Sequence, residues 1–134
     1  MKDCIFCKIA KGDIPSYKVY EDSDFLAFLD ITPRNKGHTL VIPKKHFRWV
    51  WDVDESLTEK QGIVLKKVAN ALKKALGTEF VVSFVIGEEV AHAHIHLVPR
   101  FPGDGHGALI NLSNIKQISK EEMQQIAEKI KREI

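Results

Sequence analysis

The chain has 134 residues, enough for one domain with a real core, so we expect residues 1–134 to form a single domain. The formal net charge of +2 is too small to attract nucleic acid or a charged lipid surface through the bulk field. Apolar runs such as residues 80–86 are too short to cross a membrane, and the first residues lack a signal-peptide core. We therefore expect a cytoplasmic protein with two reduced cysteines and with no nucleic-acid or membrane partner.

The first predicted elements are a short helix and three strands. Residues 4–11 form a short helical turn that Gly12 ends. Residues 17–21 and 25–29 are typical of two strands joined by a tight turn. A loop rich in proline, asparagine and glycine follows, and the β-branched, apolar residues 38–43 predict a third strand.

A long helix is expected next. Residues 58–61 match a capping box, and apolar residues recur at helical spacing as far as Leu76, with Gly77 as the stop. Residues 80–86 and 91–99 then predict the fourth and fifth strands.

The last element is an amphipathic helix that a second capping box opens at residues 119–122. Its apolar face is expected to consist of Met123, Ile126, Ala127 and Ile130. Together the elements indicate an α+β fold with a five-stranded antiparallel sheet and two main helices.

Three histidines at alternate positions carry most of the functional information. His92, His94 and His96 are separated by Ala93 and Ile95, so on a strand all three imidazoles would project from one face. Imidazole titrates near neutral pH, and its neutral form is both a nucleophile and a metal ligand. Because such a row reduces hydrophobic burial, it indicates a functional site. The alternative is that one or two of the three are hydrogen-bonded structural histidines.

This row resembles the signature of the histidine-triad (HIT) family, in which apolar residues separate three histidines. Residues 4–9, 28–31 and 37–46 are similar to other segments of the family and occur in the same order. Each segment alone is weak support, whereas four in order are strong. The resemblance spans roughly residues 3–105 and implies a HIT-like fold.

A metal site is suggested near the N-terminus. Cys4 and Cys7 have the spacing that lets one turn present two thiolates to one ion. Zinc-binding HIT proteins take two further ligands from the positions that His46 and His92 occupy here. The resemblance therefore implies a closed, structural Cys2His2 zinc site. The alternative is that the cysteines are small buried residues and that His46 faces solvent.

The resemblance also implies an enzymatic reaction. In the family the middle histidine, here His94, attacks the α-phosphate of a nucleotide, and water cleaves the nucleotidyl-histidine intermediate. His96 and His38 would donate to phosphate oxygens, and His96 would help to protonate the leaving group. This is a hydrolase or transferase for purine nucleoside phosphoramidates or dinucleoside polyphosphates. The alternatives are a zinc-stabilised nucleotide-binding module with little catalysis and a metal-binding interaction protein.

A nucleotide needs an apolar slot for its base and an acceptor for its ribose. The resemblance assigns the ribose hydroxyls to Asp30, because a carboxylate accepts from two neighbouring hydroxyls. Ordinary core packing and turn capping are the competing explanations for these positions. The residues implied around the base are Ile5, Phe6, Ile9 and Phe28.

The sequence departs from the family directly before the triad. Many HIT proteins have a glutamine and a hydroxyl residue there, both of which contact phosphate, whereas this chain has Glu88 and Glu89. A carboxylate beside a phosphate is repulsive. Either the two glutamates point away into a solvated turn, or the leaving group is cationic, or catalysis is weak.

A homodimer is the expected assembly. HIT proteins generally join two five-stranded sheets across a two-fold axis. Independently, residues 58–76 carry apolar side chains on more than one side of the predicted helix, so one side needs a second partner.

Overall fold

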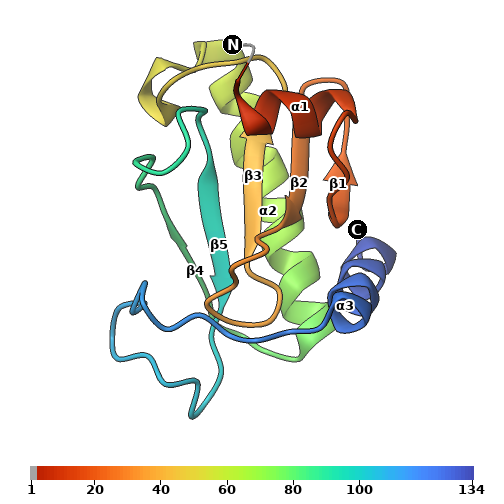
Figure 1. The fold of residues 1–134 in the computed structure, drawn as a ribbon, viewed down its shortest axis with the longest axis vertical. Coiled ribbons are helices and arrows are strands. Elements are labelled where there is room, and N and C mark those ends of the chain that lie inside the picture. The colour runs from red at the N-terminus through yellow and green to blue at the C-terminus, as the bar shows by residue number, and fades with distance from the viewer. Residues whose placement is uncertain (1–2) are drawn as a thin grey trace.

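The computed structural model describes residues 3–134 and contains one five-stranded antiparallel sheet (Figure 1). Its strand order is β1-β2-β3-β5-β4, so β1 and β4 form the edges. The α+β class and the five-stranded antiparallel sheet predicted from the sequence are confirmed. The strands are β1 (Lys18–Glu21), β2 (Phe25–Leu29), β3 (Thr39–Pro43), β4 (Val81–Phe84) and β5 (Ile95–Pro99).

Helices cover both faces of this sheet. The long helix α2 (Glu55–Leu76) and the C-terminal helix α3 (Lys120–Arg132) share one core with one face of the sheet. The short helix α1 (Ile5–Lys11) packs on the opposite face. In Figure 1, α2 runs behind the sheet and α1 crosses in front of β2 and β3. A single 3-10 turn, η1 (Val50–Asp52), precedes α2.

Strand β2 is buried throughout, because it carries apolar residues on both faces. Phe25, Ala27 and Leu29 belong to the core under α2 and α3, whereas Leu26 and Phe28 belong to the core under α1. This is the alternation that a pleated strand imposes. A central strand covered on two sides therefore explains the unbroken apolar run.

Strand register brings one triad histidine to the α1 face. Phe28 pairs with Leu40, and Leu40 pairs with His96, so the three residues form a row across β2, β3 and β5. Since Leu40 and Phe28 pack under α1, His96 projects from that same face.

The triad itself does not lie on one strand, which corrects the prediction for residues 91–99. Strand β5 begins only at Ile95, so His92 and His94 lie in the bend before it. Pro43 has no N–H, which limits the ladder that β3 can offer there. The Ala93 N–H instead donates to the carbonyl of Phe47 at 2.7 Å. His92 and His94 nevertheless contact the α1 segment, through Cys4 and Phe6, so all three histidines lie on the α1 side of the sheet.

The long helix begins earlier than predicted. Its N-cap residue is Asp54 and not Thr58, whose hydroxyl donates to the Val53 carbonyl at 3.2 Å. The predicted capping box at residues 58–61 is therefore wrong, because the helix has already begun at Glu55. The stop is confirmed: Gly77 has φ +67° and donates its N–H to Lys73.

The other predicted helices agree with the structure. Gly12, at φ +86°, ends α1. Ser119 caps α3, because its hydroxyl accepts from the Glu122 N–H at 3.1 Å. No helix within residues 3–134 combines the length and the apolar character that a membrane crossing requires. All four residues predicted for the apolar face of α3 are buried: Met123, Ile126, Ala127 and Ile130.

Candidate functional site

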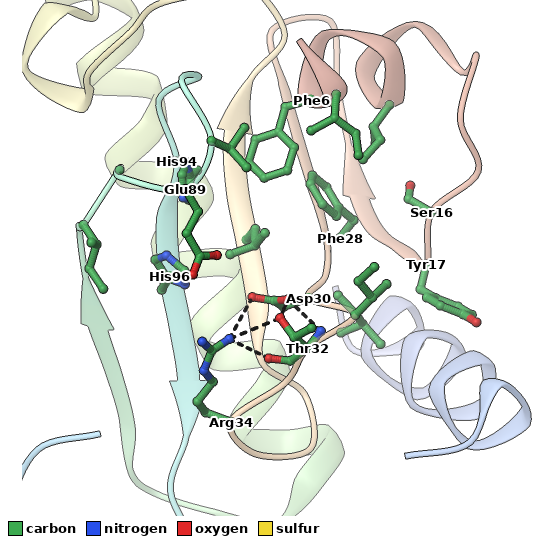
Figure 2. Close-up of a pocket in the computed structure, with 18 of the residues that line it drawn as sticks. Phe6, Ser16, Tyr17, Phe28, Asp30, Thr32, Arg34, Glu89, His94 and His96 are labelled. Carbon is green, nitrogen blue, oxygen red and sulfur yellow. Dashed lines mark hydrogen bonds and ion pairs between the residues drawn. The ribbon is translucent and has the colours of Figure 1, made fainter. Parts of the chain in front are cut away.

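A pocket of about 610 Å³ lies between α1, the sheet face beneath it and the turn before β5 (Figure 2). His94 and His96 form part of its wall, and Asp30 follows the end of β2 on the same wall. Residues predicted to act on or bind a nucleotide are therefore gathered in one place. Those that line the pocket are Ile5, Phe6, Ile9, Phe28, Asp30, Glu88, Glu89, His94 and His96.

Sequence reasoning missed several polar residues of this pocket. Ser16, Thr32, Arg34 and Ser113 line it although no motif marked them. Arg34 lies in the loop between β2 and β3, and its proximity to Asp30 in the sequence was the one available signal. Ser113 lies far along the chain, and only tertiary folding brings it here.

His94 has one nitrogen fixed and the other free. Its Nδ1 lies 2.6 Å from the carbonyl oxygen of His92, which can only accept, so Nδ1 carries the proton. The unprotonated Nε2 therefore has an available lone pair. The side chain is 6% exposed, and the edge-on ring of Phe6 lies 5.1 Å from it. This is an imidazole held in the tautomer and orientation of a nucleophile.

His38 and His96 form a hydrogen-bonded chain. The Arg34 backbone N–H donates to Nδ1 of His38 at 3.1 Å, so His38 must carry its proton on Nε2. That Nε2 lies 2.9 Å from Nδ1 of His96. His96 consequently accepts at Nδ1 and carries its own proton on Nε2. A neutral His96 can thus present an N–H donor beside His94, whose ring lies 5.1 Å away.

His38 does not contact the pocket, which differs from the prediction that it donates to phosphate. The side chain is 1% exposed and lies behind His96. Both ring nitrogens already have protein partners. Its place in the structure is that of a residue that fixes the tautomer of His96 and not of one that touches a ligand.

Both members of this chain are held neutral. Burial lowers the pKa of His38 to about 4, and the carboxylate of Asp30 offsets this only in part. Burial, together with the charges of His38, His94 and Arg34, lowers the pKa of His96 to about 3. Near pH 7 the free protein therefore has no imidazolium at either position.

Asp30 divides its oxygens between a turn and its neighbours. One oxygen accepts from both the backbone N–H and the hydroxyl of Thr32 at 2.9 Å. The other lies 3.5 Å from Nε2 of His38 and 3.9 Å from Nη1 of Arg34. One oxygen of Asp30 therefore caps the turn, while the carboxylate as a whole still lines the pocket as a hydrogen-bond acceptor.

The two glutamates before the triad line the pocket and are exposed. Figure 2 shows the carboxylate of Glu89 directed toward His96. Arg48 holds the turn that carries them through a 2.9 Å hydrogen bond to the Gly87 carbonyl. Within residues 3–134 neither Glu88 nor Glu89 forms an ion pair. The two glutamates therefore face both solvent and the pocket.

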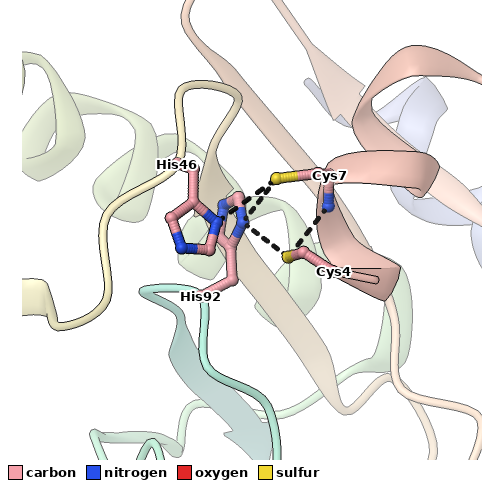
Figure 3. A group of neighbouring side chains, drawn as sticks. All are labelled: Cys4, Cys7, His46 and His92. Atoms are coloured by element: carbon pink, nitrogen blue, oxygen red, sulfur yellow. Dashed lines mark hydrogen bonds between the residues drawn. The ribbon is translucent and has the colours of Figure 1, made fainter. Parts of the chain in front are cut away.

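The four residues predicted as metal ligands converge at a second place (Figure 3). One ligand atom from each lies within 4.8 Å of the others. Nδ1 of His92 is 3.3 Å from Sγ of Cys4 and 3.5 Å from Sγ of Cys7, and Nδ1 of His46 is 3.3 Å from Sγ of Cys7. Ligands at zinc's usual bond lengths in a tetrahedron would have sulfur–nitrogen separations of about 3.6 Å.

Hydrogen bonding gives His92 the tautomer that a metal requires. Its Nε2 donates to the carbonyl of Pro43 at 2.8 Å, which leaves Nδ1 unprotonated beside the two sulfur atoms. Burial and the neighbouring Cys4 raise the pKa of the Cys7 thiol. Two thiolates at this position therefore need a cation to balance them. The residues present fit a closed four-ligand site.

Comparison with known proteins identifies the family. The family model described as "HIT domain" matches residues 11–103, so the chain belongs to the HIT family. The resemblance seen in the sequence is confirmed. An uncharacterized HIT-like protein of Methanocaldococcus jannaschii is 43% identical over 126 residues, which cover 90% of this chain and 95% of that protein.

Two further relatives bear on function. The adenosine 5'-monophosphoramidase hnt1 of Schizosaccharomyces pombe is 39% identical over 137 residues and covers 98% of both chains. A Zn-bound histidine triad family protein from Mycobacterium smegmatis has a similar structure, with a TM-score of 0.82 and 28% identity. The match covers 98% of this chain and 93% of that one. Membership of a family with named nucleotide hydrolases is thus shown.

We predict that the free energy of unfolding falls as the pH drops from 7 toward 4. A histidine in the unfolded chain has a pKa of 6.5. Below that pH the unfolded chain therefore binds protons, whereas His38 and His96 in the native protein stay unprotonated down to lower pH. Well above pH 6.5 these two histidines do not reduce the free energy of unfolding, because both are neutral in the native and in the unfolded chain. On acidification the free energy of unfolding decreases by on the order of 1–3 kcal/mol. Urea unfolding at pH 7 and pH 5 measures it.

The control for this experiment is His38→Gln, which removes one of the two groups and keeps all four candidate metal ligands. Any loss of a metal in acid would be common to both proteins and would cancel in their difference. The variant should lose less stability between the two pH values. An equal loss in both proteins would show that His38 does not contribute.

Proposed function

We propose that the protein is a nucleotidyl hydrolase or transferase that acts at the α-phosphate of nucleotide substrates through a nucleotidyl-His94 intermediate. The observation that carries this proposal is the fixed tautomer of His94, whose Nδ1 donates to His92 and whose Nε2 is left as a nucleophile in the pocket wall. The relative named as an adenosine 5'-monophosphoramidase supports a phosphoramidate substrate. Dinucleoside polyphosphates are the second substrate class.

The reaction has two displacement steps. Nε2 of His94 attacks phosphorus, a P–N bond forms, and the leaving group departs with the electron pair of its bond. The Nε2–H of neutral His96 donates a hydrogen bond to the leaving atom, which takes a proton from solvent as it departs. Water next attacks the phosphorus and loses a proton to solvent, and the P–N bond breaks with its electron pair returning to Nε2 of His94, which releases the nucleoside monophosphate.

The rest of the nucleotide would occupy the pocket between α1 and the sheet. Phe6 and Phe28, with Ile5 and Ile9, offer the apolar surface for the base, and Asp30 accepts from the ribose hydroxyls. Asp30 lies at the end of β2 that follows Phe28, on the pocket wall that also carries Thr32 and Arg34, which supports a place for the ribose beside that for the base (Figure 2).

We also propose a structural zinc ion bound by Cys4, Cys7, His46 and His92. When bound, zinc would join α1, the loop after β3 and the bend before β5, with no ligand position open for catalysis. The Zn-bound structural neighbour supports the choice of metal. The support from this chain is the donor set and the free Nδ1 of His92.

A nucleotide-binding module with little catalysis is the second candidate. Glu88 and Glu89 favour it, because two carboxylates at the phosphate end of the pocket oppose an anionic leaving group. The two candidates differ in one product. Only the enzyme forms a covalent nucleotide adduct on His94.

A homodimer is the proposed assembly. Strand β4 leaves one edge of the sheet without a neighbouring strand within residues 3–134. Beside this, Ile63 on α2 is 59% exposed and Phe80 before β4 is 57% exposed. A symmetric pairing of α2 and the β4 edge would cover both.

His94→Ala is predicted to lower turnover of an AMP phosphoramidate by about a thousandfold or more, because the nucleophile is absent. His96→Ala should lower it by about a hundredfold, since a donor is lost and the nucleophile remains. Steady-state assays measure both, and mass spectrometry after an acid quench should find one AMP on wild-type His94. Wild-type rates in His94→Ala would refute the assignment of the nucleophile.

Cys7→Ser is predicted to remove the metal and to lower the free energy of unfolding by roughly 3 kcal/mol. Elemental analysis of wild-type protein made with zinc present should find about one zinc per chain. His94→Ala is the matched control and should keep its zinc. Less than about a tenth of an equivalent in the wild type would exclude this site.

Light scattering at micromolar concentration is predicted to give twice the chain mass of 15.2 kDa. Ile63→Arg should give the monomer mass, because it places a charge in the proposed contact. Gln125→Arg, at an exposed position of α3, is the control and should leave the mass unchanged. A wild-type monomer contradicts the proposed assembly.

A further inference from the structure

The pocket has an unusual balance of charge for a site that is to bind a phosphate. Asp30, Glu88 and Glu89 contribute three carboxylates to its lining. His96 is neutral near pH 7, because burial lowers its pKa to about 3. Among the lining residues that the structure describes, Arg34 is the single basic side chain. The electrostatic attraction of a phosphate must therefore come largely from one guanidinium.

This guanidinium is held in place before any ligand binds. Nε donates to the Leu112 carbonyl at 3.0 Å, and Nη1 donates to the Thr32 carbonyl at 2.7 Å. The Arg34 side chain is 11% exposed. Within residues 3–134, Nη2 makes no hydrogen bond. Figure 2 shows the group in the wall between His96 and Asp30, with Nη1 3.9 Å from the Asp30 carboxylate.

A segment after β5, residues 104–116, fastens the loop that carries Arg34; we call it the strap. His106 donates from Nε2 to the Arg34 carbonyl at 2.8 Å, and the Lys116 N–H donates to the Pro33 carbonyl at 2.7 Å. Asn35 donates to the carboxylate of Asp104 at 3.0 Å. Three consecutive loop residues are thus tied to the strap, which begins just beyond residues 11–103 of the family match.

The strap is itself anchored to the sheet. The guanidinium of Arg100, directly after β5, pairs with Asp104 at 2.8 Å, and both side chains are less than a tenth exposed. Asp104 also accepts from the backbone N–H groups of Phe101 and His106 at 3.1 Å. A buried charged pair with these added hydrogen bonds is rigid. The position of Arg34 is therefore set by the fold rather than by the ligand.

We infer that Arg34 is a further catalytic residue, whose Nη2 binds a non-bridging oxygen of the substrate's 5'-phosphate, and that the strap positions it. This rests on the proposed function, because it requires a nucleotide with its phosphate at His94. A guanidinium suits this task, since it stays charged and donates in a fixed plane. It supplies the positive charge that the neutral His38 and His96 lack. Its pairing with Asp30 leaves the Nη2 side available.

A different role for Arg34 is to orient Asp30 for the ribose, and the two roles predict different binding data. A phosphate contact is present with AMP and absent with adenosine. An effect through Asp30 is present with both, because both have the same ribose hydroxyls. The ratio of the two dissociation constants therefore separates the roles.

The experiment measures AMP and adenosine binding to the zinc-loaded full chain by NMR chemical-shift titration. Arg34→Gln should weaken AMP binding about tenfold or more and change adenosine binding by less than about twofold. Arg34→Lys should fall between, because it keeps the charge and loses the planar geometry. Equal weakening of both ligands, or none, would overturn the phosphate contact. Thermal melting of each variant checks that the fold is kept.

The strap is tested by the same ratio. His106→Ala should reduce the preference for AMP over adenosine about threefold, and His106→Gln, which can still donate to the Arg34 carbonyl, should restore it. An unchanged ratio in His106→Ala would overturn the positioning role. If wild-type protein bound no AMP, the proposed function would fail as well. AMP binding that Arg34→Gln leaves intact would refute this inference alone.

Discussion

His92 is the residue on which the rest of the site depends, because its hydrogen bonds connect the Cys4, Cys7 and His46 group to His94. Its Nε2 donates to Pro43, which turns Nδ1 toward Cys4 and Cys7. Its carbonyl accepts from Nδ1 of His94, which leaves Nε2 of His94 unprotonated. One residue thus fixes its own tautomer through its side chain and the tautomer of His94 through its backbone carbonyl. The hydrogen bonds that hold the bend at His92 therefore also set the tautomer of His94.

The three triad histidines all lie on the α1 side of the sheet, but only His96 belongs to a strand. Because β5 starts at Ile95, His92 precedes the strand and contacts Cys4 and Cys7 of the α1 segment, whereas His96 lies on β5. His94 lies between the two sites. The motif therefore keeps the three histidines close along the chain. Since β3 ends at Pro43, His92 lies beyond the paired strands and contacts the cysteines, while His96 stays in the sheet.

The sequence predicted the sheet, both main helices and the convergence of most site residues, because these depend on local patterns. Apolar periodicity located α3 and its buried face, and the Cys-x2-Cys spacing marked two of the four side chains that cluster beside α1. Local patterns say little where a long-range contact decides the surroundings. The resemblance places His38 among the catalytic residues, whereas the structure buries it behind His96 with both ring nitrogens hydrogen-bonded. Arg34 belongs to no motif, because its side chain is held in the pocket wall by contacts with residues far along the chain, such as Leu112 and His106.

The charges in the pocket follow from this same burial. A buried histidine pair stays neutral, which suits a nucleophile and its neighbours but leaves an incoming phosphate without a cation. The loop after β2 places the Arg34 guanidinium in the pocket wall, where two carbonyl oxygens and Asp30 hold it in position. Glu88 and Glu89 also line the pocket, in the turn before the triad. Attraction to Arg34 and repulsion from these carboxylates would orient a phosphate with its charge toward Arg34, and would disfavour a leaving group that is itself strongly anionic.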